Sequence, residues 1–248
     1  MNLQRPPIGV RSLRPLAGER LLEAWERASA EVELQRPLAL LEVALPGSDS
    51  RALAELPLAE RDRLLLALHA LSFGSALDVF GTCAGCKVGF EFSVPVADLL
   101  AAQGAQATQP QISWSEAGCE FALRPVNTGD LLATLERAAL EDAQELLLER
   151  CLTTSPATGG PLPGSVLEKF EELHAGSELT CAVVCPECGH EEPVDLDIAR
   201  FLWIEVRRAA RRLLGEVHAL AAAYGWSEQA ILALSVQRRA SYLELAAR

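Results

Sequence analysis

The chain has 248 residues, of which 50% are hydrophobic and only 5% aromatic, and its formal net charge at pH 7 is −12. Leucine and alanine dominate the apolar residues, which favours helices. The acidic balance argues against nucleic acid as the main partner, because phosphate binding needs a basic surface. No stretch approaches the roughly 18 apolar residues of a membrane span, and prolines and charges break the first residues where a signal peptide would lie. We therefore expect a cytoplasmic protein without membrane insertion.

The spacing of apolar residues predicts a mostly helical chain. After an irregular arm over residues 1–17, we expect a single domain over 18–248 whose C-terminal segment, 198–248, is helical. Pro37 should interrupt the first helix and leave Leu38–Leu45 as a short apolar run, which ends at a Pro-Gly turn. The expected helices are 19–33, 58–71, 96–102, 128–152 with a break, 165–174, 198–224, 227–234 and 236–246.

Short strands should lie between these helices. Residues 88–94 alternate between apolar and polar side chains, as in a half-buried strand. The expected strands are 77–80, 88–94, 111–114 and 120–123, with a linker at 103–109 and a mobile surface loop at 153–164. The fold class predicted from this pattern is α+β, mostly α-helical with a small zinc-ribbon-like β element.

Two Cys-x-x-Cys pairs, Cys83 with Cys86 and Cys185 with Cys188, would form that β element. Four thiolates are the full ligand set of a closed tetrahedral zinc site, and closed sites are structural. The chain has 7 cysteines, an odd number, and no visible secretory signal, which favours metal-bound thiols over disulfides. We expect one structural Zn²⁺ per chain, held between knuckles at 77–94 and 179–196.

The two knuckles look like copies of one another. Cys83 and Cys185 are 102 residues apart, and the same offset brings Leu77 onto Leu179 and Val96 onto Ile198. Each copy is predicted to form a strand, a knuckle, a second strand and a helix. Each half-ribbon would then supply two of the four ligands of the metal site.

Other uses of these cysteines stay open. The pairs could be buried cysteines left after metal loss, or redox pairs, although no thioredoxin-like pattern surrounds them. Cys181 or His190 could substitute as a ligand, but the repeat aligns them with Val79 and Val88, which are strand positions.

Nothing in the sequence marks a catalytic site. Cys119 and Cys151 stand alone and are expected to be small buried residues, and no histidine lies in a recognisable catalytic motif. Among the C-terminal residues, Arg207 and Arg211 belong to a basic cluster that either pairs with the chain's own glutamates or docks an acidic partner. Trp203 and Trp226 are aromatic anchors of the kind found in cores and interfaces.

Beside both knuckles, the chain has an Arg-Pro-x-x-x-x-Asp-Leu segment at 124–131 and the segments 197–205, 212–218, 223–228, 231–235 and 238–243. Together these motifs resemble the T4-type phage baseplate protein family of contractile phage tails and phage-tail-like injection systems. The resemblance covers roughly residues 36–245 and is strongest after Thr180. The first knuckle departs from the family pattern, with Ala84-Gly85 in place of a proline and Lys87 in place of a glycine.

The resemblance implies no enzymatic activity. It implies a baseplate assembly factor or minor structural component whose partners are hub, spike or wedge proteins of the same particle, into which it could be incorporated. Two other functions remain open at this point. One is a general zinc-ribbon adaptor for protein interactions, for example in transcription. A basic face and DNA affinity would favour it, and the net charge argues against it. The other is a cysteine-dependent enzyme using Cys119 or one of the Cys-x-x-Cys pairs.

Overall fold

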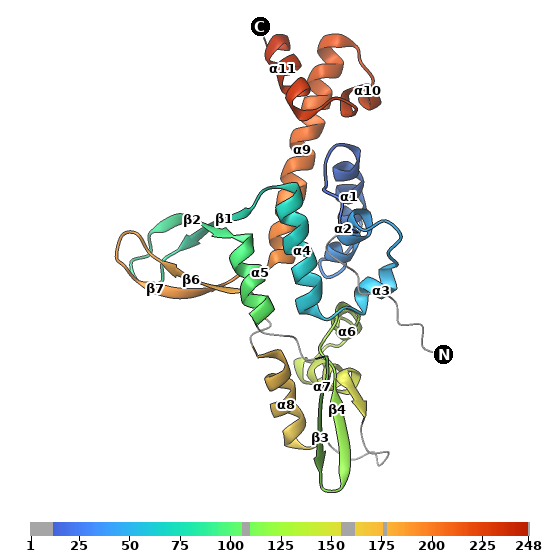
Figure 1. Ribbon diagram of the computed structural model, residues 1–248, viewed down its shortest axis with the longest axis vertical. Coiled ribbons are helices and arrows are strands. Elements are labelled where there is room, and N and C mark those ends of the chain that lie inside the picture. The colour runs from blue at the N-terminus through green and yellow to red at the C-terminus, as the bar shows by residue number, and fades with distance from the viewer. Residues whose placement is uncertain (1–11, 106–109, 155–161, 176–177, 248) are drawn as a thin grey trace.

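One long helix, α9 (Ile198–Tyr224), forms the spine of the molecule in the computed structural model, which describes residues 12–105, 110–154, 162–175 and 178–247 (Figure 1). The carboxylate of Asp197 caps it by accepting a hydrogen bond from the backbone N–H of Arg200. It ends at Gly225, whose φ of 69° lies in the left-handed region that glycine adopts without strain. Within the described ranges, no helix is both long and apolar enough to traverse a lipid bilayer.

Three helices pack against α9 and a fourth, α5 (Val96–Ala105), packs against α4 (Leu58–Ser72), and together they enclose the main hydrophobic core (Figure 1). Leu40, Leu64, Leu68 and Leu202 are fully buried there. Burying such side chains is the main favourable contribution to folding. The other two helices are α1 (Glu19–Ser29) and α2 (Arg36–Ala44).

The expectation around Pro37 is wrong. Pro37 lies in the first turn of α2, where its missing N–H is not needed, so the apolar residues after it continue as a helix. A short helix that the sequence did not indicate, α3 (Ser50–Ala54), begins where Asp49 accepts a hydrogen bond from the backbone N–H of Arg51.

The N-terminal arm is irregular in its described part, residues 12–17, but it is packed against the core. Leu13 and Leu16 are buried, and the backbone N–H of Leu16 donates to the hydroxyl of Ser72. Residues 1–11 of the predicted arm lie outside the described residues, as do 106–109 of the predicted linker and 155–161 of the predicted loop.

A second, smaller hydrophobic cluster lies at the opposite end of the molecule from the C-terminal helices (Figure 1). Phe121, Leu123 and Val166 are buried in it. The predicted hairpin is present, and it gains a third strand at residues that the sequence analysis assigned to a helix end and a loop. The elements are β3 (Ile112–Glu116), β4 (Cys119–Leu123), α6 (Thr128–Thr134), α7 (Leu140–Cys151), β5 (Leu152–Thr154) and α8 (Gly164–His174).

A buried carboxylate joins the elements of this smaller cluster. Asp130 is fully buried and accepts two hydrogen bonds from the guanidinium of Arg124, at 2.6 and 2.9 Å, and one from Arg150 at 3.0 Å. It also completes a capping box with Asn127 at the start of α6. The Arg-Pro-x-x-x-x-Asp-Leu segment therefore has a structural explanation, since its arginine and aspartate form this ion pair.

Two more pairs of strands form an arm that projects sideways from the spine (Figure 1). One hairpin is β1 (Ala76–Thr82) with β2 (Gly89–Pro95), and the other is β6 (Thr180–Val184) with β7 (Glu191–Asp195). The expected class, α+β and mostly helical with small antiparallel sheets, is confirmed.

The chain ends in a small helical head at the far end of α9, formed by α10 (Glu228–Leu232) and α11 (Val236–Ala246) (Figure 1). Serine side chains cap both helices. Arg239 is buried and pairs with Glu216 of α9 at 2.9 Å, which fastens the head to the spine.

His69 is a buried titratable group in the main core. Its ring lies 5.8 Å from that of Phe73 and 5.6 Å from that of Phe201, and its Nδ1 has no hydrogen-bond partner among the described residues. Burial lowers the pKa of His69 below its usual value of 6.5, and the carboxylates of Glu205 and Asp78 oppose that shift only in part.

Stability should therefore rise with pH in the window just below 6.5. In that window the unfolded chain binds a proton at this position and the folded chain does not, so acid favours unfolding until the lowered folded-state pKa is reached. Urea unfolding at several pH values measures the slope. His69→Phe, which keeps an aromatic ring in the core, should flatten the slope, whereas His218→Gln at an exposed position should not. An equal slope in His69→Phe would contradict this assignment.

Candidate metal centre

Backbone hydrogen bonds shape the turn of the first hairpin around its cysteines. The backbone N–H of Cys83 donates to the carbonyl of Val88, and the N–H of Lys87 donates to the carbonyl of Cys83, each at 3.0 Å. Lys87 has a φ of 63°, in the left-handed region that favours glycine. Lys87 therefore adopts a backbone conformation that costs a non-glycine residue some strain.

The second hairpin repeats this turn. The backbone N–H of Cys185 donates to the carbonyl of His190 at 2.9 Å, and the N–H of Gly189 donates to the carbonyl of Cys185 at 3.0 Å. Gly189 has a φ of 72°, close to that of Lys87 at the equivalent position. The strand registers also agree, because Cys181 pairs with Val194 just as their counterparts in the first hairpin pair with one another. The internal repeat is thus present in the backbone as well as in the sequence.

The two turns bring their four cysteine sulfurs into one cluster. All four atoms lie within 4.8 Å of one another, with Cys83 Sγ 3.6 Å from Cys188 Sγ and Cys86 Sγ 3.7 Å from Cys185 Sγ. A tetrahedral zinc site with Zn–S bonds of about 2.3 Å has sulfurs about 3.8 Å apart. The donor set and its dimensions therefore fit one metal ion. Cys83 and Cys185 are buried, and Cys86 and Cys188 are exposed.

The electrostatics of the cluster also favour a bound cation. The backbone N–H groups of Cys86 and Gly85 point at the sulfur of Cys83 and lower its pKa to about 6. The N–H of His190 acts in the same direction on Cys188, but the sulfurs of Cys86 and its neighbours outweigh it and raise the pKa of Cys188 to about 12. Four thiolates this close repel one another, so full deprotonation needs a positive ion among them.

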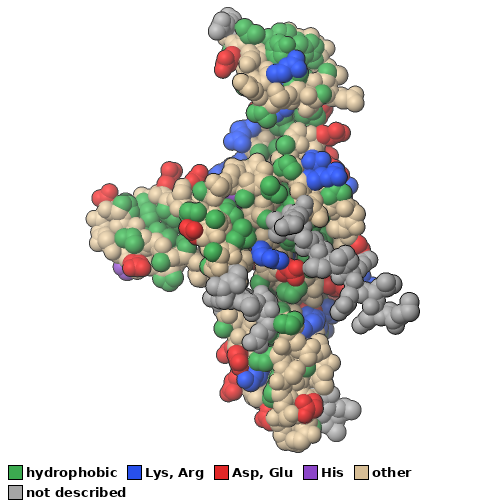
Figure 2. Space-filling model, in the orientation of Figure 1, with side chains coloured by type: hydrophobic (Ala, Val, Ile, Leu, Met, Phe, Trp, Pro, Cys, Tyr) green, Lys and Arg blue, Asp and Glu red, His purple; other side chains and the backbone are tan. Residues whose placement is uncertain are grey.

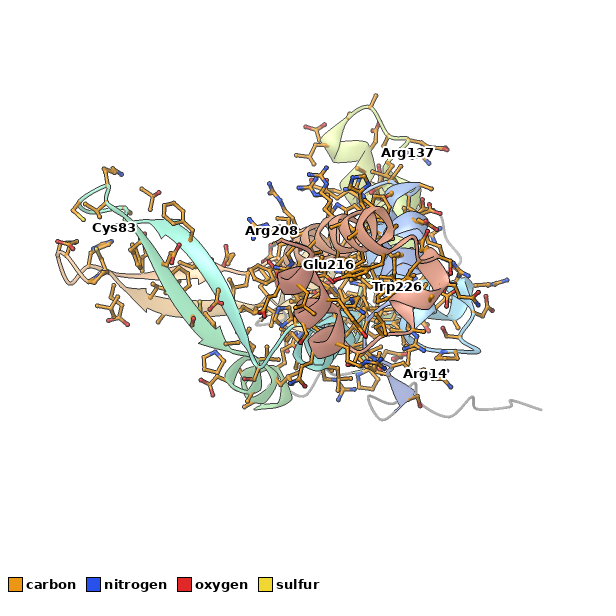
Figure 3. The ribbon with its side chains drawn as sticks, turned by 90° about the horizontal axis from the view of Figure 1, so that it is seen from above. Arg14, Cys83, Arg137, Arg208, Glu216 and Trp226 are labelled. Carbon is orange, nitrogen blue, oxygen red and sulfur yellow. The ribbon has the colours of Figure 1, made fainter. Side chains whose placement is uncertain are left out.

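The tips of the hairpins are joined at this cluster. The hairpins form two separate sheets with no ladder between them. Beside the sulfurs, the backbone N–H of Ala84 donates to Glu192 at 3.1 Å, and Gly85 lies so close to the ring of His190 that a Cβ there would be 3.3 Å from it. Figure 3 shows Cys83 at the outer end of the arm, away from the helical body. The cluster therefore fastens together two segments that are distant in the sequence.

The alternative cysteines do not enter the cluster. Cys181 lies in β6 and packs against the main core. The carbonyl of His190 accepts the hydrogen bond from Cys185 within the turn, and the side chain of His190 lies against Gly85. Cys119 and Cys151 pack in the smaller hydrophobic cluster, as expected of small apolar residues. Burial raises the pKa of Cys151 to about 11, which disfavours its thiolate at neutral pH.

The predicted partner-binding residues lie along α9 and in the head. Trp203 is half-buried, and the guanidinium of Arg36 lies over its ring at 5.3 Å. Arg207 and Arg211 are exposed. Trp226 stacks on Tyr224 at 4.7 Å and so contributes to packing in the head (Figure 3). Their role in binding a partner stays a prediction.

Arg36, which reaches Trp203 from α2, was not among the residues predicted for the site. Nothing in the sequence pairs the two residues, because their contact depends on how α2 and α9 cross.

Comparison with protein-family models, with curated proteins and with solved structures found no match to this chain.

Proposed function

We propose that the four-cysteine cluster holds one structural zinc ion and that the chain is an assembly factor or minor structural component of the baseplate of a contractile, phage-tail-like injection system. It would act in the cytoplasm and could stay in the finished particle. All four coordination positions of the site are supplied by cysteine, which leaves no position for a substrate. The metal would hold the arm together rather than carry out chemistry.

The observation that carries this proposal is the placement of the residues that resemble the baseplate family. They run from the second knuckle through α9 to the head, and so include the spine to which the other parts attach. Around that spine the arm, the head and the smaller cluster protrude in different directions (Figure 1). A shape of this kind offers separate surfaces to several neighbours, as a component that brings baseplate proteins together requires.

Affinity purification from cells that produce the particle tests this function. The tagged chain should recover hub, spike or wedge proteins in amounts comparable to its own. The Cys83→Ser, Cys185→Ser double variant serves as a matched bait with a disrupted arm, and lower recovery with it would place a contact there. Recovery of RNA polymerase, or of no partner at all by the unmodified chain, would count against the baseplate assignment.

A further inference from the structure

A mainly apolar pocket of about 490 Å³ opens at the base of α9, where the segment between α1 and α2 meets α6 and the first turns of α9. Val32, Pro37, Leu131, Leu135 and Trp203 line it. Val32 is 52% exposed and Leu135 58% exposed. A concave site with exposed apolar side chains on its walls is typical of a binding surface.

Arginine side chains line the same pocket. Arg61 is committed to a 2.7 Å ion pair with Asp62. Arg36 has no such partner: its guanidinium lies over the ring of Trp203, and its buried Nε makes no hydrogen bond within the described residues. Arg200 is a third, exposed arginine on the pocket wall.

Two carboxylates also reach this pocket, but neither forms an ion pair with Arg36 or Arg200 among the described residues. The side chain of Asp197 accepts the capping hydrogen bond at the start of α9. Glu33 is exposed on the rim and forms no ion pair with any described residue. Arg36 and Arg200 therefore make no direct ion pair with a described residue, while the two carboxylates offset their charge at the pocket itself.

Exposed arginines without ion pairs to described residues lie along α9 beyond the pocket. Arg207 and Arg211 lie one and two turns beyond Trp203, which places them about 6 and 12 Å further along the helix axis. Both are exposed, and neither forms an ion pair with a described residue, whereas Arg208 on the flank pairs with Glu205. Figure 2 shows the face of the spine turned to the viewer, where basic and acidic side chains are interspersed. We call Arg200, Arg207 and Arg211 the basic track.

We propose that the pocket and the basic track together bind an acidic segment of a partner protein, with an apolar side chain in the pocket and carboxylates on the track. The apolar side chain would lie against Trp203 and Leu135. Carboxylates after it, one helical turn apart, would face Arg207 and Arg211. The argument for this occupant is charge complementarity, because these unpaired arginines stand out on a chain of net charge −12. An apolar cavity gives no advantage to a bare phosphate backbone, which favours a protein over a nucleic acid. The inference rests on the proposed function only in that the chain acts by binding another protein.

Fluorescence anisotropy with the full chain tests the proposal. The probe is a labelled synthetic peptide with leucines at one end followed by glutamates at helical spacing. We expect saturable binding that weakens roughly fivefold in Arg207→Glu and in Arg211→Glu, and about tenfold or more in Leu135→Asp. The matched control is Arg212→Glu, on the same helix but about 140° around its axis from Arg207, which should change the affinity by less than about twofold. Thermal melts verify that each variant is folded.

Equal binding of a peptide with lysines in place of the glutamates would overturn the proposal, as would equal binding of a single-stranded oligonucleotide. Unchanged affinity in both Arg207→Glu and Arg211→Glu would also overturn it. The outcome is separable from that of the baseplate assignment. If the unmodified chain recovers baseplate proteins but does not bind the peptide, only the binding site formed by the pocket and the basic track is refuted. If it binds the peptide but does not recover baseplate proteins, only the baseplate assignment is refuted.

Discussion

Replacing Cys83 and Cys185 together with serine is expected to abolish metal binding and to unfold the arm. These are the two buried ligands, one from each knuckle, so the double variant leaves each hairpin with a single exposed thiolate. Structural zinc contributes on the order of 10 kcal/mol of apparent binding free energy in zinc-finger peptides at neutral pH, and that energy is available to the fold. We expect metal analysis to give about one zinc per purified wild-type chain and almost none in the variant, with global stability lower by several kcal/mol.

Hydrogen exchange locates the damage. Amide protection should be lost over both hairpins but kept in the part of α9 that packs in the main core, because only the tips of the hairpins depend on the metal. Cys181→Ser is the matched control, since it removes a neighbouring thiol that lies outside the cluster, and its zinc content should match that of the wild type. A wild-type content far below one ion would refute the single site, and loss of zinc in Cys181→Ser would refute the ligand set.

Replacing Asp130 with alanine should lower the free energy of unfolding by about 3 kcal/mol. The carboxylate is fully buried, and its removal leaves the guanidinium groups of Arg124 and Arg150 without their acceptor. It also leaves the backbone N–H of Asn127 unpaired at the start of α6. Urea denaturation of the full chain measures the change. Asp142→Ala, which removes an exposed carboxylate from the first turn of α7, should cost less than about 0.5 kcal/mol.

The hydrogen bonds to Asp130 also predict how the stability of the fold changes in acid. Burial alone would raise the pKa of Asp130, but the hydrogen bonds from Arg124, Asn127 and Arg150 prevail and hold it below its usual 3.8. The stabilisation of the fold by the ionised Asp130 is therefore present above pH 3.8 and is lost as the pH falls through the lowered folded-state pKa. If Asp130→Ala unfolds at the same urea concentration as Asp142→Ala, the ion pair does not stabilise the fold.

Local rules in the sequence accounted for much of the fold. The limits of α9 follow from a capping aspartate, a continuous apolar face and Gly225, all of which act within a few residues. Pro37 misled because a proline both interrupts a helix and starts one, and the choice depends on whether the following residues find a core to pack against. The third strand, β5, was missed for a related reason, since a segment of three residues carries no periodicity and is defined by its pairing with β4.

By itself, the sequence determined which four cysteines could hold a metal ion, and it determined the internal repeat. A Cys-x-x-Cys turn is built by hydrogen bonds between residues at most five positions apart, so its geometry depends only on neighbouring residues. The same turn therefore recurs 102 residues later, where the same pattern is repeated. The tertiary structure decided that the two turns meet tip to tip, that Arg150 joins the Arg124–Asp130 pair, and that Arg36 lies over Trp203 beside an open pocket. Each of these contacts links side chains brought together by the crossing of separate elements, and no spacing along the chain encodes such a crossing.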